Sequence, residues 1–85
     1  MSKLKPSAVE KQNEIIYANI KSRCAYFGYD SDIKASAKIC MDSKTFYYRK
    51  RNGGWKSDEL TYAAEALKVP VAWLMIDHSD MRKAT

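Results

Sequence analysis

Residues 33–56 read I-K-A-S-A-K-I-C-M-D-S-K-T-F-Y-Y-R-K-R-N-G-G-W-K, and this stretch decides the fold. Its pattern predicts a short helix, a tight turn at Cys40 and Met41, and a second helix over about residues 43–51. Asp42 is placed to cap the second helix, because its carboxylate can accept hydrogen bonds from the backbone N–H groups of the first turn. The rest of the chain is predicted to support this pair of helices.

The second helix of the pair has two different sides. With about 100° of rotation per residue and Phe46 pointing inward, Arg49 and Lys50 flank the buried side. Their aliphatic stems are expected to cover the edge of the core while their charges reach water. The outward side combines basic and aromatic side chains, namely Lys44, Tyr47, Tyr48 and Arg51.

Positive charge is concentrated in the same stretch. The chain has 15 Lys and Arg residues against 10 Asp and Glu residues, a formal net charge of +5. Residues 38–56 contain six of these bases and one acid, also +5, so the nine bases and nine acids elsewhere cancel. A localised basic excess indicates an anionic partner, and a helix, a turn and a basic second helix form the arrangement that lays a helix in the major groove of DNA.

The remaining sequence predicts further helices and no strands. Apolar residues recur at helical spacing in the first helix, at Val9, Ile16, Ile20 and Cys24. Gly28 suits the left-handed position at the end of the first helix, and Ser31 or Asp30 can cap the second. Ser57 is the expected N-cap of the fourth helix, and Pro70 can open the fifth. The expected helices cover about residues 7–26, 32–39, 43–51, 58–68 and 70–76.

We therefore predict an all-α fold, a compact five-helix domain that contains a helix-turn-helix. The domain is expected over residues 7–77, after a disordered segment at residues 1–6 and before a polar tail at residues 78–85 with an exposed His78. With 85 residues and 46% hydrophobic content, the chain can form one compact core and no enclosed active-site cavity of any size.

The sequence contains no residue set typical of an enzyme or a metal site. Cys24 and Cys40 form no CxxC motif and His78 is the single histidine, so a four-ligand zinc site is not predicted. Both cysteines are expected to be reduced and buried, as in a cytoplasmic protein. No signal peptide and no membrane-spanning run is recognised, and no metal, cofactor or small-molecule ligand is expected.

Several parts of the sequence resemble the phage repressor and Cro-type helix-turn-helix domains, a lambda-repressor-like group of small DNA-binding regulators. They are A-S-A-K-I-C-M-D-S-K-T-F-Y at residues 35–47, N-G at residues 52–53, and E-L-T-Y-A-A-E-A-L-K-V-P-V-A-W-L at residues 59–74. The resemblance covers about residues 16–76. It implies a transcriptional regulator that binds double-stranded DNA sequence-specifically, of the kind that phages and mobile elements use as repressors.

Two positions depart from the family pattern. Cys40 stands in the tight turn where the family usually has glycine, so the turn is either strained or built differently. Asp32 stands where the family often has a glutamine that touches a phosphate, and a carboxylate would repel that phosphate. No phosphate contact is therefore carried over to Asp32.

The resemblance implies two sets of DNA contacts on the remaining positions. The residues expected to contact base edges are Ser43, Lys44, Tyr47 and Tyr48, of which Tyr48 could contact the DNA backbone instead. The residues expected to approach phosphates are Lys34, Thr45, Arg51, Asn52 and Lys56.

Three interpretations stay open on the sequence alone. The apolar side of the last helix, with Trp73, Met75 and Ile76, either joins two copies into a homodimer on DNA or closes the core of a monomer. Residues 52–54, Asn-Gly-Gly, either cradle a phosphate or simply end the third helix. The alternative function is a protein-interaction module of antitoxin or anti-repressor type that keeps the fold, and a third is an accessory role in DNA bending.

Overall fold

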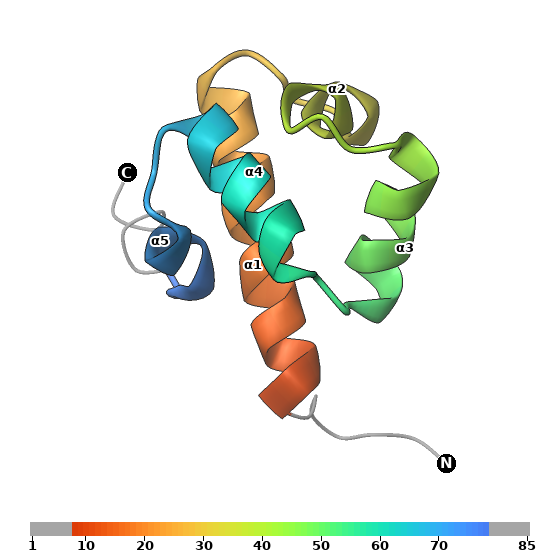
Figure 1. Cartoon of the computed structure of the whole chain (residues 1–85), viewed down its shortest axis with the longest axis vertical. Coiled ribbons are helices and arrows are strands. Elements are labelled where there is room, and N and C mark those ends of the chain that lie inside the picture. The colour runs from red at the N-terminus through yellow and green to blue at the C-terminus, as the bar shows by residue number, and fades with distance from the viewer. Residues whose placement is uncertain (1–7, 79–85) are drawn as a thin grey trace.

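A computed structural model describes residues 8–78, and these residues form five α-helices without a strand (Figure 1). The helices are α1 (Ala8–Tyr26), α2 (Asp32–Lys38), α3 (Ser43–Asn52), α4 (Ser57–Leu67) and α5 (Val71–Met75). The predicted all-α class is confirmed over this range. The predicted disordered segment at residues 1–6 lies outside the described residues, as does the predicted tail beyond His78.

The long helix α1 is the common support of the fold, since it packs against each of the other four helices. Figure 1 shows α1 and α4 in the middle, with α2 and α3 on one side and α5 on the opposite side. The two helices that carry the candidate functional residues, α3 and α5, therefore lie at opposite edges of the molecule.

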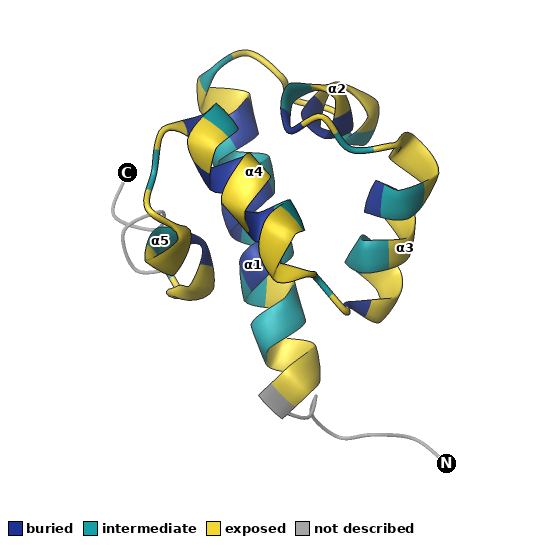
Figure 2. Ribbon diagram, viewed as in Figure 1, coloured by how far each residue is buried: buried dark blue, intermediate teal, exposed yellow. Residues whose placement is uncertain are grey.

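The core is formed by apolar side chains from all five helices, as the dark blue segments of Figure 2 indicate. Its fully buried members include Ile20, Cys24, Ala35, Phe46, Ala63, Leu67 and Leu74. The spacing of four along α1 correctly places Ile16, Ile20 and Cys24 inward. Val9 was expected on the same stripe but is 79% exposed, because the first turns of α1 extend beyond the helices that cover the rest of it.

Side-chain caps begin α2 and α3 as predicted. The Ser31 hydroxyl accepts a hydrogen bond from the Lys34 N–H at 3.1 Å, and the Asp42 carboxylate accepts from Lys44 and Thr45 at 3.1 and 3.4 Å. The expected cap of α4 was wrong by one residue. Ser57 is its first helical residue, and Lys56 is the N-cap, whose backbone N–H donates to Glu59 at 2.9 Å.

Three helices end with the same pair of backbone hydrogen bonds and a left-handed residue. After α1, Gly28 has φ +92°, whereas Cys40 after α2 and Lys68 after α4 have φ +58° and +61°. After α2, the Cys40 N–H donates to the Ala37 carbonyl oxygen, and the Met41 N–H donates to the Ser36 carbonyl oxygen. The turn before α3 therefore places a side chain in a left-handed conformation where glycine is favoured.

This turn geometry corrects one expectation about the cysteines. Cys24 is fully buried as predicted, but Cys40 is exposed, and both are free thiols. Burial was predicted from the apolar neighbours of Cys40 in the sequence. The left-handed conformation instead directs its side chain away from the core.

A buried amide and a ring stack attach α5 to the rest of the molecule. The Asn19 side-chain nitrogen, on α1, lies 3.3, 2.8 and 2.7 Å from the carbonyl oxygens of Trp73, Leu74 and Ile76. His78 was predicted to be an ordinary exposed residue of the tail, which is wrong. Its ring is partly buried and stacks on Trp73 with centroids 4.2 Å apart, and Nε2 lies 2.9 Å from the Trp73 carbonyl oxygen.

Candidate nucleic-acid interface

Helix α3 is attached to the core by one aromatic side chain. Phe46 is 1% exposed and lies between the rings of Tyr17 and Trp55, with centroid distances of 5.9 and 6.1 Å. Trp55 packs against the core, and its indole N–H donates to the side chain of Asn13 at 2.8 Å. The side of α3 opposite to Phe46 is therefore fixed toward solvent.

An ion pair joins the end of α3 to α4. The Arg49 guanidinium donates two hydrogen bonds to the Glu59 carboxylate, at 2.9 and 3.1 Å. The bonds raise the pKa of Arg49. Burial opposes ionisation of Glu59, but hydrogen bonds from Arg49 and from the Lys56 backbone outweigh it and lower the pKa of Glu59. The expected exposure of the Arg49 charge to water is thus wrong.

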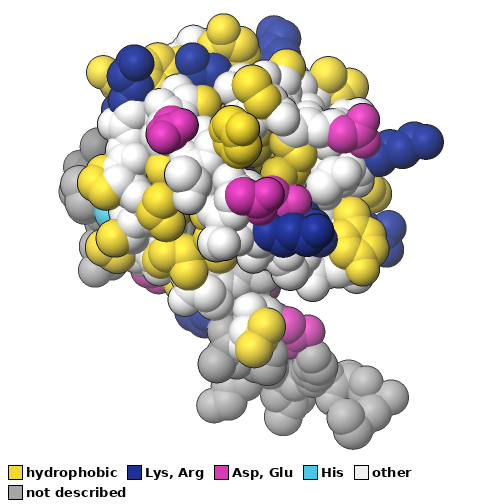
Figure 3. Space-filling model, viewed as in Figure 1, with side chains coloured by type: hydrophobic (Ala, Val, Ile, Leu, Met, Phe, Trp, Pro, Cys, Tyr) yellow, Lys and Arg dark blue, Asp and Glu magenta, His cyan; other side chains and the backbone are white. Residues whose placement is uncertain are grey.

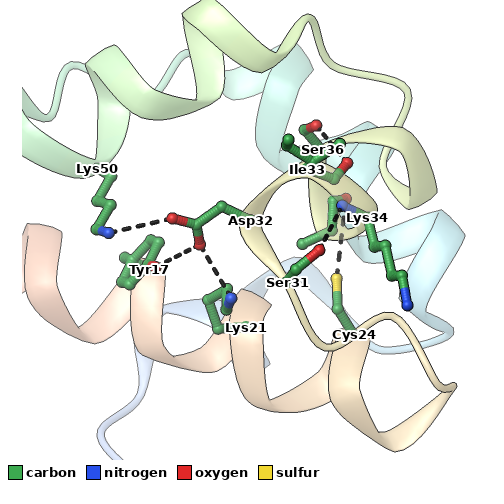
Figure 4. Close-up of polar contacts among 10 residues, drawn as sticks. Tyr17, Lys21, Cys24, Ser31, Asp32, Ile33, Lys34, Ser36 and Lys50 are labelled. Atoms are coloured by element: carbon green, nitrogen blue, oxygen red, sulfur yellow. Dashed lines mark hydrogen bonds and ion pairs between the residues drawn. The ribbon is translucent and has the colours of Figure 1, made fainter.

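A second group of charges joins α1, α2 and α3 around Asp32, which begins α2 (Figure 4). Its carboxylate accepts hydrogen bonds from the Tyr17 hydroxyl at 2.7 Å, from Lys21 Nζ at 2.9 Å and from Lys50 Nζ at 3.1 Å. We call these four residues the Asp32 cluster. The bond from Tyr17, with those from the two lysines, lowers the pKa of Asp32 to about 2 against the effect of burial.

The Asp32 cluster also corrects the sequence-based view of Lys50. Its ammonium group was expected to reach water beyond the core edge, but it is bound to Asp32 and lies 5.1 Å from the Tyr17 ring. Of the consecutive bases Arg49, Lys50 and Arg51, two are therefore turned back into the molecule. Arg51 alone stays on the outer side of α3.

The outer side of α3 gathers all four predicted base-contacting residues on one exposed face. Tyr47 and Tyr48 are 52% and 57% exposed, and Ser43, Lys44 and Arg51 are exposed beside them (Figure 2). The Arg51 guanidinium lies 5.6 Å from the Tyr47 ring centre. Among the described residues, neither Lys44 nor Arg51 is paired with an acid.

The predicted phosphate-contacting residues are more scattered. Arg51 and Asn52 lie at the end of α3, Lys56 precedes α4, and Lys34 lies on α2, where it faces Asp30 at 3.7 Å. Thr45 is only partly exposed. Figure 3 shows basic side chains projecting from the edge of the molecule that α3 occupies in Figure 1.

The two glycines after α3 end the helix. The Gly53 N–H donates to the Arg49 carbonyl oxygen at 2.8 Å and is therefore already used. Gly53 is also buried, and a Cβ added there would lie 3.2 Å from the Asn13 side chain. Of the two interpretations of residues 52–54, the geometry favours the helix stop over the phosphate cradle.

Ile33 is a candidate that the sequence analysis missed. Although apolar, it is 73% exposed, and with Asp32, Ser43, Lys44 and Tyr47 it lines an open hollow of about 280 Å³ between α2 and α3. Its position on α2 could have indicated this exposure, because the inner side of that helix is formed by the small or apolar residues Ala35, Ser36 and Ile39. An exposed isoleucine beside a basic helix suits contact with an apolar group such as a thymine methyl.

The predicted dimer surface divides into an inner and an outer part. Leu74 is fully buried and Trp73 is partly buried, so that both help to close the core. Val71, Met75 and Ile76 are 38%, 38% and 54% exposed at the edge opposite to α3. Both interpretations of the last helix therefore have a structural counterpart, on different residues.

Within residues 8–78, His, Cys, Asp and Glu side chains nowhere gather into a group that could hold a metal ion. In the same part of the chain, none of the helices combines the length and the apolar character needed to span a membrane. Comparison with known proteins gives no match, whether with family models, curated proteins or solved structures.

Proposed function

We propose that this protein is a sequence-specific regulator of transcription that binds double-stranded DNA by placing α3 in the major groove. The observation that carries the proposal is the division of α3 into two sides. Phe46, Arg49 and Lys50 attach one side to the fold, and the opposite side exposes two bases, two tyrosines and a serine. An exposed face of this composition suits a polyanion with readable base edges.

Affinity and sequence preference have different sources in this proposal. Arg51, Lys56 and Lys34 supply affinity by displacing counterions from phosphates, which makes binding depend steeply on salt. Ser43, Lys44 and Tyr47 read base edges, and each good contact pair discriminates by ~1–3 kcal/mol. Tyr48 contacts a base or the adjacent backbone, and Thr45 and Asn52 approach phosphates.

The biological setting we propose rests on the resemblance of residues 16–76 to phage repressor and Cro-type domains. A cytoplasmic repressor of phage or mobile-element type would act by occluding a promoter. The protein would bind as a homodimer to two half-sites, with Trp73, Met75 and Ile76 as the proposed dimer surface. No catalytic activity or cofactor is part of the proposal.

Fluorescence anisotropy of a labelled random-sequence duplex, titrated at several salt concentrations, tests the DNA-binding step. The variant Lys44→Glu/Arg51→Glu is expected to bind roughly 100-fold or more weakly, because it replaces two attractive contacts with repulsive ones. Lys11→Glu/Lys68→Glu makes the same change in net charge away from α3 and is the control. Equal losses in both variants would show that α3 is not the binding face.

Selection of a binding site from a random library tests sequence specificity. Lys44→Ala is expected to weaken binding to the selected site by about 5- to 150-fold and to relax the preference at one base pair. A loss of the same size on every sequence would make Lys44 a phosphate contact instead.

A protein-interaction module of antitoxin or anti-repressor type is the second candidate, and a specific observation favours it. Val71, Met75 and Ile76 expose apolar surface on a short helix at the molecular edge. Sedimentation at a range of concentrations, with Met75→Ser/Ile76→Ser alongside, separates self-association from a monomer that uses this surface for a different protein. DNA binding that survives in a monomeric double variant would remove the homodimer from the proposal.

A further inference from the structure

The Asp32 cluster lies at the border of the face proposed to contact DNA. Asp32 lines the same hollow as Ser43, Lys44 and Tyr47, and Lys50 Nζ is 5.9 Å from the Tyr47 ring centre. Lys50 is thus positioned beside Tyr47 on the outer side of α3, and Lys21 binds the same carboxylate from α1. Both of them point toward a single carboxylate in Figure 4.

The cluster keeps these lysines in place by several simultaneous contacts. Lys21 and Lys50 bind different oxygens of Asp32, at 2.9 and 3.1 Å, and their side chains are 24% and 37% exposed. The Tyr17 hydroxyl donates to the same oxygen as Lys21, and its ring supports Lys50 from 5.1 Å. A phosphate would have to displace a carboxylate that is already aligned to recruit either ammonium group.

We propose that Asp32 is a specificity-determining residue, which holds Lys21 and Lys50 away from the DNA backbone and thereby limits sequence-independent binding. The inference rests on the proposed DNA-binding function. Phosphate contacts supply affinity for every sequence alike, whereas base contacts distinguish sequences. A protein that keeps two neighbouring lysines from phosphates leaves a larger share of its affinity to Ser43, Lys44 and Tyr47.

Asp32→Asn tests the inference in the full chain, with random-sequence and selected duplexes titrated over a series of salt concentrations. Release of one or both lysines is expected to raise affinity for the random duplex about 10-fold and to steepen the slope of log K against log salt by ~0.9 for each new phosphate contact. The ratio of specific to random affinity should fall. Glu65→Gln, which makes the same charge change on the exposed side of α4, is expected to leave the slope unchanged.

Lys50→Gln and Arg51→Gln form a second test that keeps the carboxylate in place. The two bases are neighbours on α3, but Lys50 is held by Asp32 and Arg51 is exposed. Lys50→Gln should leave the salt slope of the wild type unchanged, whereas Arg51→Gln should reduce it by ~0.9. If circular dichroism shows that Asp32→Asn does not fold, the comparison of Lys50→Gln with Arg51→Gln still tests whether Asp32 holds Lys50 away from DNA.

The outcomes separate the inference from the function on which it rests. If the wild type binds DNA but Asp32→Asn has the salt slope of Glu65→Gln, or if Lys50→Gln loses as much slope as Arg51→Gln, Asp32 has no role in specificity. If the wild type does not bind duplex DNA even at low salt, the proposed function and the inference fail together.

Discussion

Helices α3 and α5 lie at opposite edges of the molecule and are attached to the rest of the fold by different kinds of contact (Figure 1). Phe46, the Arg49–Glu59 ion pair and the Asp32 cluster fix α3, so polar and charged bonds surround one buried ring. Leu74 and the Asn19 amide fix α5. The α3 edge is left with basic and aromatic side chains, and the α5 edge with apolar ones.

The difference shows that the way an edge is attached decides which partner it suits. On α3, Arg49 and Lys50 form ion pairs with acids of other helices. Lys44 and Arg51 remain available to bind an external anion. On α5, the inner side uses Leu74 and part of Trp73, and the apolar remainder projects outward. In the proposed function, the first edge contacts a nucleic acid and the second edge contacts a protein surface.

The largest expected effect comes from breaking the attachment of α3. Phe46→Ala removes a fully buried ring and leaves a cavity, so the free energy of unfolding should fall by about 3–5 kcal/mol. Urea denaturation followed by circular dichroism measures it. Tyr48→Ala removes an aromatic ring from the outer side of the same helix and should change stability by no more than about 0.5 kcal/mol. Similar losses in both variants would mean that α3 is not anchored by Phe46.

The attachment of α5 is expected to be the next most sensitive. Asn19→Ala removes the side-chain donor from the carbonyl groups of Leu74 and Ile76, which should destabilise the protein by about 2–3 kcal/mol. In a Trp55→Phe background, the fluorescence of Trp73 measures the unfolding of the region around α5. Asn52→Ala, whose amide makes one exposed bond of 3.3 Å, is the matched control and should be nearly neutral. A neutral Asn19→Ala would contradict the role of the amide.

Acid should weaken the α3 edge through Asp32. The pKa of Asp32 falls from 3.8 to about 2 on folding, so its contribution is complete above pH 4 and is lost as the pH falls toward 2. A shift of this size corresponds to roughly 2 kcal/mol, which solvent screening at this partly exposed site reduces to about 1 kcal/mol. The difference in stability between the wild type and Asp32→Asn should shrink over that interval. A difference that is constant from pH 5 to pH 2 would contradict the prediction.

The smallest effect is expected at the turns that lead into the two edges. Cys40 precedes α3 and Lys68 precedes α5, and both have positive φ without being glycine. Glycine adopts this conformation without strain, although it also gives the unfolded chain more conformational freedom. Because the first effect is the larger one, Cys40→Gly and Lys68→Gly should each stabilise the protein by about 0.5 kcal/mol. Thermal unfolding compares them with Cys40→Ala, which keeps the left-handed side chain and should be neutral. Destabilisation by both glycines would show that the turns carry no strain.

The features that sequence predicted correctly depend on neighbouring residues. Ser31, Asp42 and Gly28 act within their own turns, and the inward direction of Phe46 follows from helical periodicity. The missed contacts join distant parts of the chain. Asp32 binds residues that are 11, 15 and 18 positions away, and the partners of Asn19 are 54 to 57 positions away.

Contacts between distant parts of the chain also explain which parts of the candidate site were predicted wrongly. Helical periodicity placed Lys44, Tyr47, Tyr48 and Arg51 on one outer side, and they are exposed there. It also predicted solvated charges on Arg49 and Lys50, because the acids that bind them lie on other helices. Cys40 was expected inside for its apolar neighbours, and the backbone conformation of a single turn residue overrode that tendency.

The Asn19 contacts have a consequence for biosynthesis. Ribosomes add about 5–20 residues per second, so a residue 57 positions after Asn19 is made roughly 3–11 seconds later. A helix forms within about a microsecond, and α1 can therefore be complete long before α5 exists. During those seconds the buried amide and the apolar stripe of α1 lack their final cover. The nascent chain thus presents a surface that a chaperone can bind until α5 emerges and closes it.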